Sequence, residues 1–385
     1  MIQARSLMKD DVYERLARHL DDLPGGYPKT ESGVELRILR RLFTVKEAEL
    51  ATKLSLLPQE AGVIARKAGL SRAEAAVRLE ELSKKGLIYR LESPAGTPKY
   101  TAIQFAIGIW EFHVNDLSPE LIRDVEEYLP TLLNLETWKK APQLRTVPVG
   151  RSIPVAIEIM AHENAEAMVR KQTKWLVAPC ICRRERKMVG EGCSRQEEAC
   201  LVFGRGADFY ERNGIGRKIS LEEALAILRI ADEEGLILQP SNSQKIANIC
   251  CCCGCCCGVL RTIKRHPKPA GIVSTPFTAS ADPETCSSCG TCVSRCQMAA
   301  VRLDQGKSLI DQDRCIGCGL CVSTCPTGSL RLIRKAAEKP PEVPKNQFEA
   351  YRNLGRVRGK LGTARQARIV LQAAYDRLRA RKSTS

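Results

Sequence analysis

The chain has 385 residues, with 44% hydrophobic and 27% charged side chains, which is typical of a globular protein with more than one domain. The formal net charge of +16 is concentrated at the C-terminal end, where residues 345–385 hold eleven Lys or Arg and two acidic residues, so the basic total alone does not indicate nucleic-acid binding. No run approaches the ~20 apolar residues of a membrane span, and the N-terminus lacks the apolar stretch of a signal peptide, so we expect a cytoplasmic protein.

The N-terminal third predicts helices separated by turn signals. Residues 7–22 predict a helix, which gives an N-terminal helix and linker over residues 1–30. Capping boxes at Thr44 and Ser71 mark later helix starts. The helices are expected to begin at residues 34, 45, 58 and 72, and the strands to cover residues 87–92 and 99–103. This order resembles a winged helix-turn-helix, which we predict over residues 31–117.

The last helix of that segment has a composition that does not favour DNA binding. Its core stripe is predicted to consist of Ala75, Leu79 and Leu82. The opposite face holds small, apolar and acidic residues: Ala73, Ala76, Val77 and Glu80. Base readout normally uses Arg, Lys, Asn or Gln, and acidic groups repel phosphates. DNA is therefore a partner that the sequence allows but does not favour, and protein docking or a structural role is preferred.

The rest of the chain completes an α+β multidomain prediction. Further helices are expected at residues 105–116, 118–135, 162–174 and 220–231. We predict a helical Cys-rich domain over 118–270, a bacterial 2[4Fe–4S] ferredoxin-like domain over 271–336 and a basic tail over 337–385. Glycines in the tail argue against one rigid helix before residue 363. The tail is expected to steer an acidic redox partner, to contact nucleic acid or to be a flexible solubilising end.

The cysteines determine the chemistry. There are nineteen, none precedes Cys180, and all lie between residues 180 and 325. In a reducing compartment clustered thiols usually bind metal rather than form disulfides. Only four histidines are present, so the ligands are expected to be sulfur atoms, which favours iron–sulphur clusters or zinc.

The strongest motif is C-x2-C-x2-C-x3-C, which runs from Cys286 to Cys296 and again from Cys315 to Cys325. This is the bacterial two-cluster spacing, in which the fourth cysteine of each copy binds the other cluster. We therefore assign one [4Fe–4S] cluster to Cys286, Cys289, Cys292 and Cys325. We assign a second to Cys315, Cys318, Cys321 and Cys296. Zinc held by C-x2-C pairs is the alternative.

Several residues around the motif refine this prediction. The glycines at 290, 317 and 319 suit a backbone that closes tightly around a cluster. Residues 300–310 predict a small hairpin, and residues 329–333 resemble its counterpart. Gln297 stands where the first copy usually has proline, and we expect it to loosen one turn or to change access to the cluster.

A second cysteine region lies upstream and has no simple repeat. Eleven thiols occur here, and Cys252-Cys253-Gly254 resembles the CCG motif of heterodisulfide-reductase-type subunits, although the companion spacing is missing. We predict a third iron–sulphur cluster that joins the 180–200 group to the 250–257 group. Its candidate ligands are Cys180, Cys182, Cys193, Cys200, Cys250, Cys252, Cys253 and Cys255. The alternatives are zinc, a mixed structural site or a redox-active thiol pair.

Taken together, these segments resemble a family of 4Fe–4S dicluster ferredoxin-type proteins of anaerobes with an N-terminal winged-helix domain. The likeness runs through residues 23–30, residues 42–49, Pro179-Cys-Ile-Cys-Arg183, the run from Cys250, and both C-x2-C-x2-C-x3-C motifs. It implies an iron–sulphur protein and leaves its physiological partners undefined.

The favoured function is electron transfer between a donor and a partner reductase. This makes the chain an electron-transfer component of an oxidoreductase rather than a stand-alone enzyme. One alternative is a redox-responsive winged-helix transcription regulator. Another is a reductase subunit with an atypical catalytic cluster at the Cys180–Cys257 site. No Gly-rich loop of the Rossmann or P-loop type is present, so no nucleotide cofactor is expected.

Overall fold

The computed structural model describes residues 11–93, 96–153, 160–335 and 342–382. It mixes helices and antiparallel sheets, in agreement with the predicted α+β class. The chain forms two compact units, one of residues 1–132 with 355–385 and one of residues 133–354. These units are coarser than the five predicted segments, whose boundaries stay predictions.

The described part of the first unit is mainly helical. Its helices are α1 (Val12–Asp21), α2 (Val34–Leu42), α3 (Val45–Ala51), α4 (Ala61–Ala68), α5 (Arg72–Lys84), α6 (Trp110–Phe112), α7 (Pro119–Leu132) and α16 (Thr363–Lys382). The predicted capping box is present at α3, where Thr44 and Glu47 cap each other's backbone N–H. Ser71 caps α5 through the N–H of Glu74. The predicted helix over residues 7–22 is observed as α1, and residues 7–10 lie outside the described residues.

A three-stranded antiparallel sheet accompanies these helices, in the order β1–β3–β2. Its strands are β1 (Gln59–Glu60), β2 (Tyr89–Glu92) and β3 (Pro98–Thr101). The predicted hairpin is confirmed by the β2–β3 pairing, and residues 94–95 at its tip lie outside the described residues. The predicted helix start at Pro58 is wrong, because Gln59 and Glu60 pair with β3 and α4 begins only at Ala61. The winged-helix assignment stays a prediction.

The predicted core stripe of α5 is confirmed, since Ala75, Leu79 and Leu82 are all buried. The opposite face holds Val77, which is 60% exposed, and Glu80, which pairs with Arg90 of β2. The exposed surface of this helix therefore remains poor in the side chains that read DNA bases.

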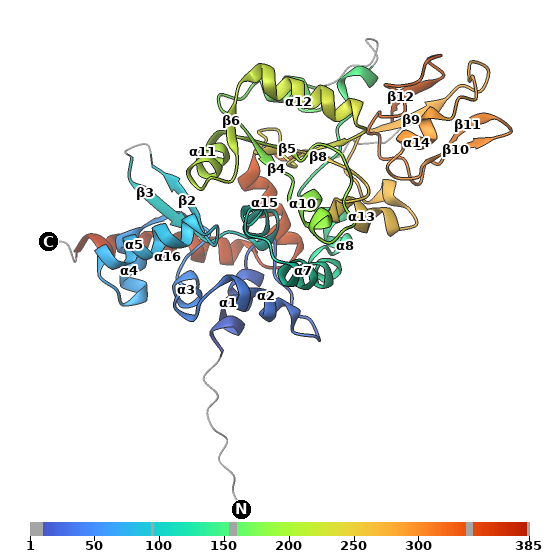
Figure 1. Ribbon diagram of the computed structural model, residues 1–385. Coiled ribbons are helices and arrows are strands. Elements are labelled where there is room, and N and C mark those ends of the chain that lie inside the picture. The colour runs from blue at the N-terminus through green and yellow to red at the C-terminus, as the bar shows by residue number, and fades with distance from the viewer. Residues whose placement is uncertain (1–10, 94–95, 154–159, 336–341, 383–385) are drawn as a thin grey trace, which may run out of the picture. The chain divides into compact units, whose positions relative to one another are not determined.

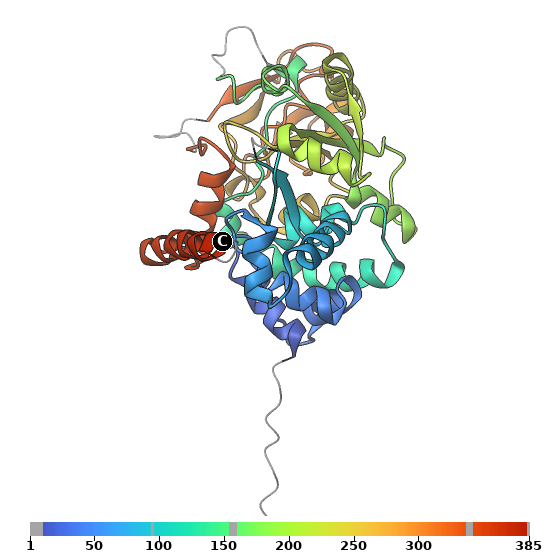
Figure 2. The same ribbon diagram turned by 90° about the vertical axis from the view of Figure 1, so that its left-hand side faces the viewer.

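The basic tail contains two helices, α15 (Gln347–Val357) and α16. A turn with Gly359 at φ +69° separates them, which agrees with the predicted break before residue 363. Asp376 of α16 forms a 2.9 Å ion pair with Lys67 of α4. Figure 2 shows α16 as the red helix that ends at the C-terminal mark. Residues 363–382 are therefore helical, and the three roles predicted for the tail stay predictions.

The second unit contains a five-stranded antiparallel sheet in the order β6–β4–β5–β8–β7. Its strands are β4 (Trp175–Pro179), β5 (Glu198–Phe203), β6 (Arg217–Ile219), β7 (Ile237–Pro240) and β8 (Asn248–Cys252). The prediction of a helical domain over 118–270 is therefore wrong for this part. The strands β4, β5 and β7 are short, mainly apolar runs whose side chains are largely buried on both faces of the sheet, and periodicity does not distinguish such runs from buried helix.

Helices flank this sheet, as Figure 1 shows for α11 and α12. The described helices of the unit before the C-terminal cysteines are α8 (Leu135–Lys140), α9 (Ala165–Arg170), α10 (Ile181–Met188), α11 (Gly204–Arg212), α12 (Leu221–Glu233) and α13 (Gly258–Arg265). The predicted helix after Ser220 is confirmed as α12, with Ser220 as its cap. We call residues 175–265 the sheet region.

The C-terminal cysteines lie in a small segment of residues 277–334, which we call the repeat module. It holds the strands β9 (Phe277–Ala281), β10 (Val301–Asp304), β11 (Lys307–Ile310) and β12 (Leu330–Arg334), and the helix α14 (Thr291–Arg295). The predicted hairpin is confirmed as β10–β11. The other pair joins β12 to β9, a strand that the sequence did not reveal. Figure 1 shows both pairs at one end of the unit.

Candidate metal centre

The structure gathers the first predicted ligand set of the repeat module around one pocket. Its lining includes Cys286, Cys289, Cys292 and Cys325. Hydroxyl groups accompany the thiols: the Ser308 Oγ lies 3.5 Å from the Cys286 Sγ and 3.2 Å from the Cys292 Sγ. The Thr291 Oγ1 lies 3.5 Å from the Cys289 Sγ. Thiolates at these positions would therefore receive hydrogen bonds from the protein.

These hydrogen bonds favour the thiolate form. The Ser308 hydroxyl, with the backbone N–H groups of Ser288 and Ser308, lowers the pKa of Cys286 to about 7. The Thr291 hydroxyl likewise lowers the pKa of Cys289. For Cys325, burial opposes ionisation, but hydrogen bonds from the backbone of Leu330 and from Thr327 lower the pKa overall. Because the thiolate is the form that binds metal, this set is prepared for a cation.

The second predicted set, formed by Cys315, Cys318, Cys321 and Cys296, is more deeply placed. Cys315 and Cys321 belong to the apolar core of the module. Burial raises the pKa of Cys318 to about 12, and the neighbouring charges of Cys296 and Cys315 add to this shift. Backbone N–H groups donate to two of the sulfur atoms, from Ala279 to Cys315 at 3.3 Å and from Ala300 to Cys296 at 3.1 Å. Bound metal ions would supply the positive charge that these buried thiolates lack.

Gly317 shows why the repeat needs glycine beside its cysteines. Its φ is +64°, and a Cβ there would collide with the carbonyl oxygen of Phe277 on β9. The strand that the sequence did not reveal is thus packed directly against the second motif.

The side chain of Gln297 forms hydrogen bonds outside its own turn, and its predicted effect on the turn or on cluster access stays a prediction. Its Oε1 accepts a 2.9 Å hydrogen bond from the N–H of Gly254, and its Nε2 donates to the carbonyl of Gly235 at 3.0 Å. Arg295 of α14 adds bonds to the carbonyls of Asp232 and Glu233. The residue that replaces the usual proline therefore connects the repeat module to the cysteine loop of the sheet region.

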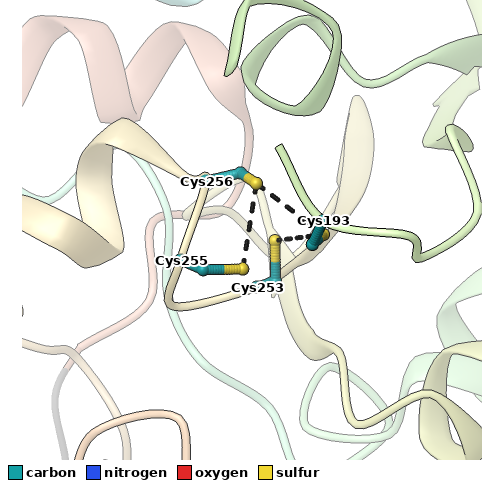
Figure 3. A group of neighbouring side chains, drawn as sticks. All are labelled: Cys193, Cys253, Cys255 and Cys256. Atoms are coloured by element: carbon teal, nitrogen blue, oxygen red, sulfur yellow. Dashed lines mark hydrogen bonds between the residues drawn. The ribbon is translucent and has the colours of Figure 1, made fainter. Parts of the chain in front are cut away.

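Four upstream thiols form a compact group, which we call the quartet: Cys193, Cys253, Cys255 and Cys256. Their sulfur atoms all lie within 4.8 Å of one another. Figure 3 shows three of them on the loop before α13, turned toward Cys193 on a separate segment. A bond from the N–H of Cys257 to the carbonyl of Cys253 closes this loop at 3.1 Å, which brings its thiols to one side.

The quartet only partly matches the predicted third site. Cys193, Cys253 and Cys255 were predicted, and Cys256 was missed because nothing in the spacing distinguishes it from its neighbours. The other predicted thiols do not belong to the quartet; they are Cys180, Cys182, Cys200, Cys250 and Cys252. The turn of the loop, rather than a sequence interval, selects the members.

Positive charge lies beside the quartet. The Arg195 Nη1 donates to the Cys255 Sγ at 3.5 Å, and the Arg195 Nε donates to the carbonyl of Glu234 at 2.9 Å. Burial opposes ionisation of Cys193, but hydrogen bonds from the Arg195 backbone and the Cys256 thiol lower its pKa overall. Four thiols beside a fixed guanidinium are a donor set suited to a thiophilic metal.

Comparison with known proteins agrees with the chemistry of the repeat module. Residues 309–331 match the model of the 4Fe-4S binding domain. The match spans the second motif and supports at least one [4Fe–4S] cluster, so the chain is an iron–sulphur protein. The chain matches no curated protein and no solved structure at a significant level.

Proposed function

We propose that this chain is an iron–sulphur electron-transfer protein that relays electrons between a donor and a partner reductase. Its repeat module is a two-cluster ferredoxin-like domain, and its sheet region holds a third iron–sulphur cluster. The observation that carries the proposal is the pairing of two four-thiol sets in a module whose second half matches a 4Fe–4S binding domain.

The donor atoms fit such clusters. All nineteen cysteines lie in the described part of the chain as free thiols. The first set lines a single pocket, and the second is buried with backbone N–H groups donating to sulfur. When bound, a [4Fe–4S] cluster supplies one-electron transfer without an acid or a base.

The protein's own contribution is to hold the thiolates and to set their environment. Cys289 is exposed and Cys292 is buried, so the first set reaches from the core to the surface. In the second set, Cys315 and Cys321 are buried. Since hydrogen bonds and burial tune cluster potentials, the two sites are expected to differ in potential. The exposed edge at Cys289 is the side that a redox partner would approach.

The contacts of Gln297 support a route to the sheet region. Gln297 follows Cys296, a ligand of the proposed second cluster, and its side chain bonds Gly254 between Cys253 and Cys255. Such a contact fixes the repeat module against the sheet region, which a relay between clusters in the two regions requires. The eleven upstream thiols also keep the reductase-subunit alternative open, with the atypical site as its catalytic centre.

The winged-helix-like segment has a docking role in this proposal. The winged-helix-like segment over residues 31–117 is proposed to contact protein rather than DNA, since α5 exposes Val77 and pairs Glu80 internally. The cytoplasm, whose thiols are kept reduced, is the proposed compartment. Among the described helices, none combines the length and the apolar character that crossing a bilayer would require.

The test is ligand removal in the anaerobically purified full chain. Cys289→Ala and Cys318→Ala should each delete one low-temperature electron paramagnetic resonance signal and about four iron atoms per chain, the content of one cluster. Ser294→Ala, an exposed position on α14, is the matched control and should keep both signals. Both signals surviving in both cysteine variants, or zinc in place of iron, would refute the ligand assignment.

A further inference from the structure

Six upstream thiols remain once the quartet and Cys251 are set aside. They are Cys180, Cys182, Cys200, Cys250, Cys252 and Cys257, which we call the six-thiol group. The β ladder explains why they meet: Cys200 of β5 lies directly opposite Cys250 of β8, and Cys252 follows on the same face. Cys180 occupies the N-cap position of α10, and Cys257 occupies that of α13. Strand pairing and two helix starts therefore converge on one place.

The thiols of this group act on one another. Neighbouring thiols and burial together raise the pKa of Cys180, Cys182, Cys250, Cys252 and Cys257, as expected of sulfur atoms that lie close to one another. Two side-chain amides donate to sulfur atoms of this group. The Asn248 Nδ2 lies 3.4 Å from the Cys250 Sγ, and the Gln239 Nε2 lies 3.9 Å from the Cys257 Sγ. Cys252 and Cys257 are buried and the other four are half-buried.

Arg183 places a buried positive charge beside the upstream thiols. The side chain is only 2% exposed, and its Nε and Nη1 have no hydrogen-bond partner among the described residues. Its Nη2 donates to the carbonyl of Cys251. Burial opposes the guanidinium charge, whereas Cys180 and Cys252 of this group, Cys253 of the quartet and Cys251 favour it and raise its pKa overall. A buried guanidinium is costly beside neutral thiols and favourable beside metal-bound thiolates.

The backbone adds further positive potential. Cys180 and Cys257 stand at the N-termini of α10 and α13, each eight residues long. Helix N-termini carry partial positive charge and free N–H groups, which stabilise an anionic group. Both ends therefore complement the negative charge of a thiolate-bound cluster.

The quartet has a different geometry. Its sulfur atoms lie 3.7 Å apart between Cys256 and Cys193, 3.8 Å between Cys255 and Cys256, and 3.9 Å between Cys193 and Cys253. A tetrahedral ion with metal–sulfur bonds of about 2.3 Å has ligand atoms about 3.8 Å apart. The spacing leaves room for one ion at the centre.

We propose that the upstream cysteines form two separate metal sites. The six-thiol group holds the third iron–sulphur cluster, and the quartet holds a single tetrahedral divalent ion, Zn²⁺ or Fe²⁺. This inference rests on the proposed function for the existence of a third cluster, and it reassigns the ligands of that cluster. Cys251 belongs to neither site, because strand alternation turns it away from Cys250 and Cys252.

Neighbouring residues provide matched variants for the test in the full chain, purified without oxygen. Iron and zinc are counted by elemental analysis, and ⁵⁷Fe Mössbauer spectra identify the iron species. Cys252→Ala should lose the iron of one cluster while keeping the quartet ion. Cys251→Ala, one residue away on β8, should keep all metal. Cys255→Ala, at an exposed position, should lose only the single ion. A tetrahedral ferrous component in the Mössbauer spectrum would identify the quartet ion as Fe²⁺. Bound zinc without that component would identify it as Zn²⁺.

Equal iron contents in Cys252→Ala and Cys251→Ala would overturn the proposal, as would loss of cluster iron in Cys255→Ala. Native mass spectrometry of the unaltered chain covers the case in which a variant does not fold. Three clusters plus one ion support the two sites, and two clusters alone overturn them. The electron paramagnetic resonance signals of the two repeat-module clusters in the same sample distinguish failure of this inference from failure of the proposed function. If they are present without upstream iron, only this inference fails, and if they are missing, the proposed function fails as well.

Discussion

The repeat module and the sheet region gather their cysteines by different means. In the repeat module, each motif supplies its ligands within eleven residues, and the flanking strands are four or five residues long. Three of the cysteines are themselves members of the small core. In the sheet region, Cys200 and Cys250 are fifty positions apart and meet only because β5 pairs with β8.

This difference has a consequence for stability. The sheet region has its own apolar core, in which Leu201, Ile249 and Leu238 are almost completely buried. The repeat module depends on its thiols and therefore on what they bind. We expect metal to be needed for folding of the module and not for folding of the sheet.

The largest expected effect is that of iron removal on the repeat module. Chelation without oxygen should abolish hydrogen-exchange protection in β10 and β11, while β4 and β5 keep theirs. The reason is that uncompensated thiolates would remain in the core of the module. Reconstitution with iron and sulphide should restore protection. Equal protection of β10 with and without iron would show that the two regions do not differ in this way.

The next effect concerns the apolar core of the sheet. Leu201→Ala should lower the free energy of unfolding of the sheet region by about 2–5 kcal/mol, because Leu201 is fully buried. Leu309→Ala on β11, where the side chain is 39% exposed, is the comparison and should change stability by less than about 0.5 kcal/mol. Denaturant unfolding of the metal-loaded chain measures both. Similar losses for the two variants would contradict the assignment of the core.

A smaller effect is expected for the contact between the repeat module and the sheet region. Gln297→Ala removes the bonds to Gly254 and Gly235 and should destabilise their contact by about 1–3 kcal/mol. Hydrogen exchange at the Gly254 amide should become faster, whereas the exposed Arg302→Ala should leave it unchanged. An unchanged exchange rate at Gly254 would mean that Gln297 does not connect the regions.

The smallest effect is on the acid sensitivity of the first ligand set. In the metal-loaded chain the Ser308 hydroxyl lies beside the Cys286 sulfur, where it lowers the pKa of that thiol to about 7 from its ordinary value of 9.0. Because the folded-state pKa is the lower one, the stabilisation by the Cys286 thiolate is present above pH 9 and disappears as pH falls through 7. Ser308→Ala should therefore release iron from the module at a higher pH, which iron release followed against pH measures. Identical release curves for the two proteins would show that Ser308 does not control the thiol.

Much of the molecule could be predicted because the signals are local. Capping at Thr44 and Ser71, the stripe of α5 and the β10–β11 hairpin all depend on residues within a few positions of each other. The prediction was wrong where short apolar runs are buried on both sides. Those runs became β4, β5 and β7 of a sheet, and β9 was not recognised as the partner of β12.

By itself, the sequence determined the chemistry of the C-terminal thiols, because the spacing of a repeat fixes how closely its sulfur atoms approach. It also showed that sulfur rather than histidine would bind metal. Only the tertiary structure decided how the upstream thiols are divided. Strand register places Cys250 and Cys252 on one face of the sheet and Cys251 on the other, and a closed turn adds Cys256 to the quartet. Strand pairing joins positions far apart along the chain, so no interval in the sequence encodes these neighbours.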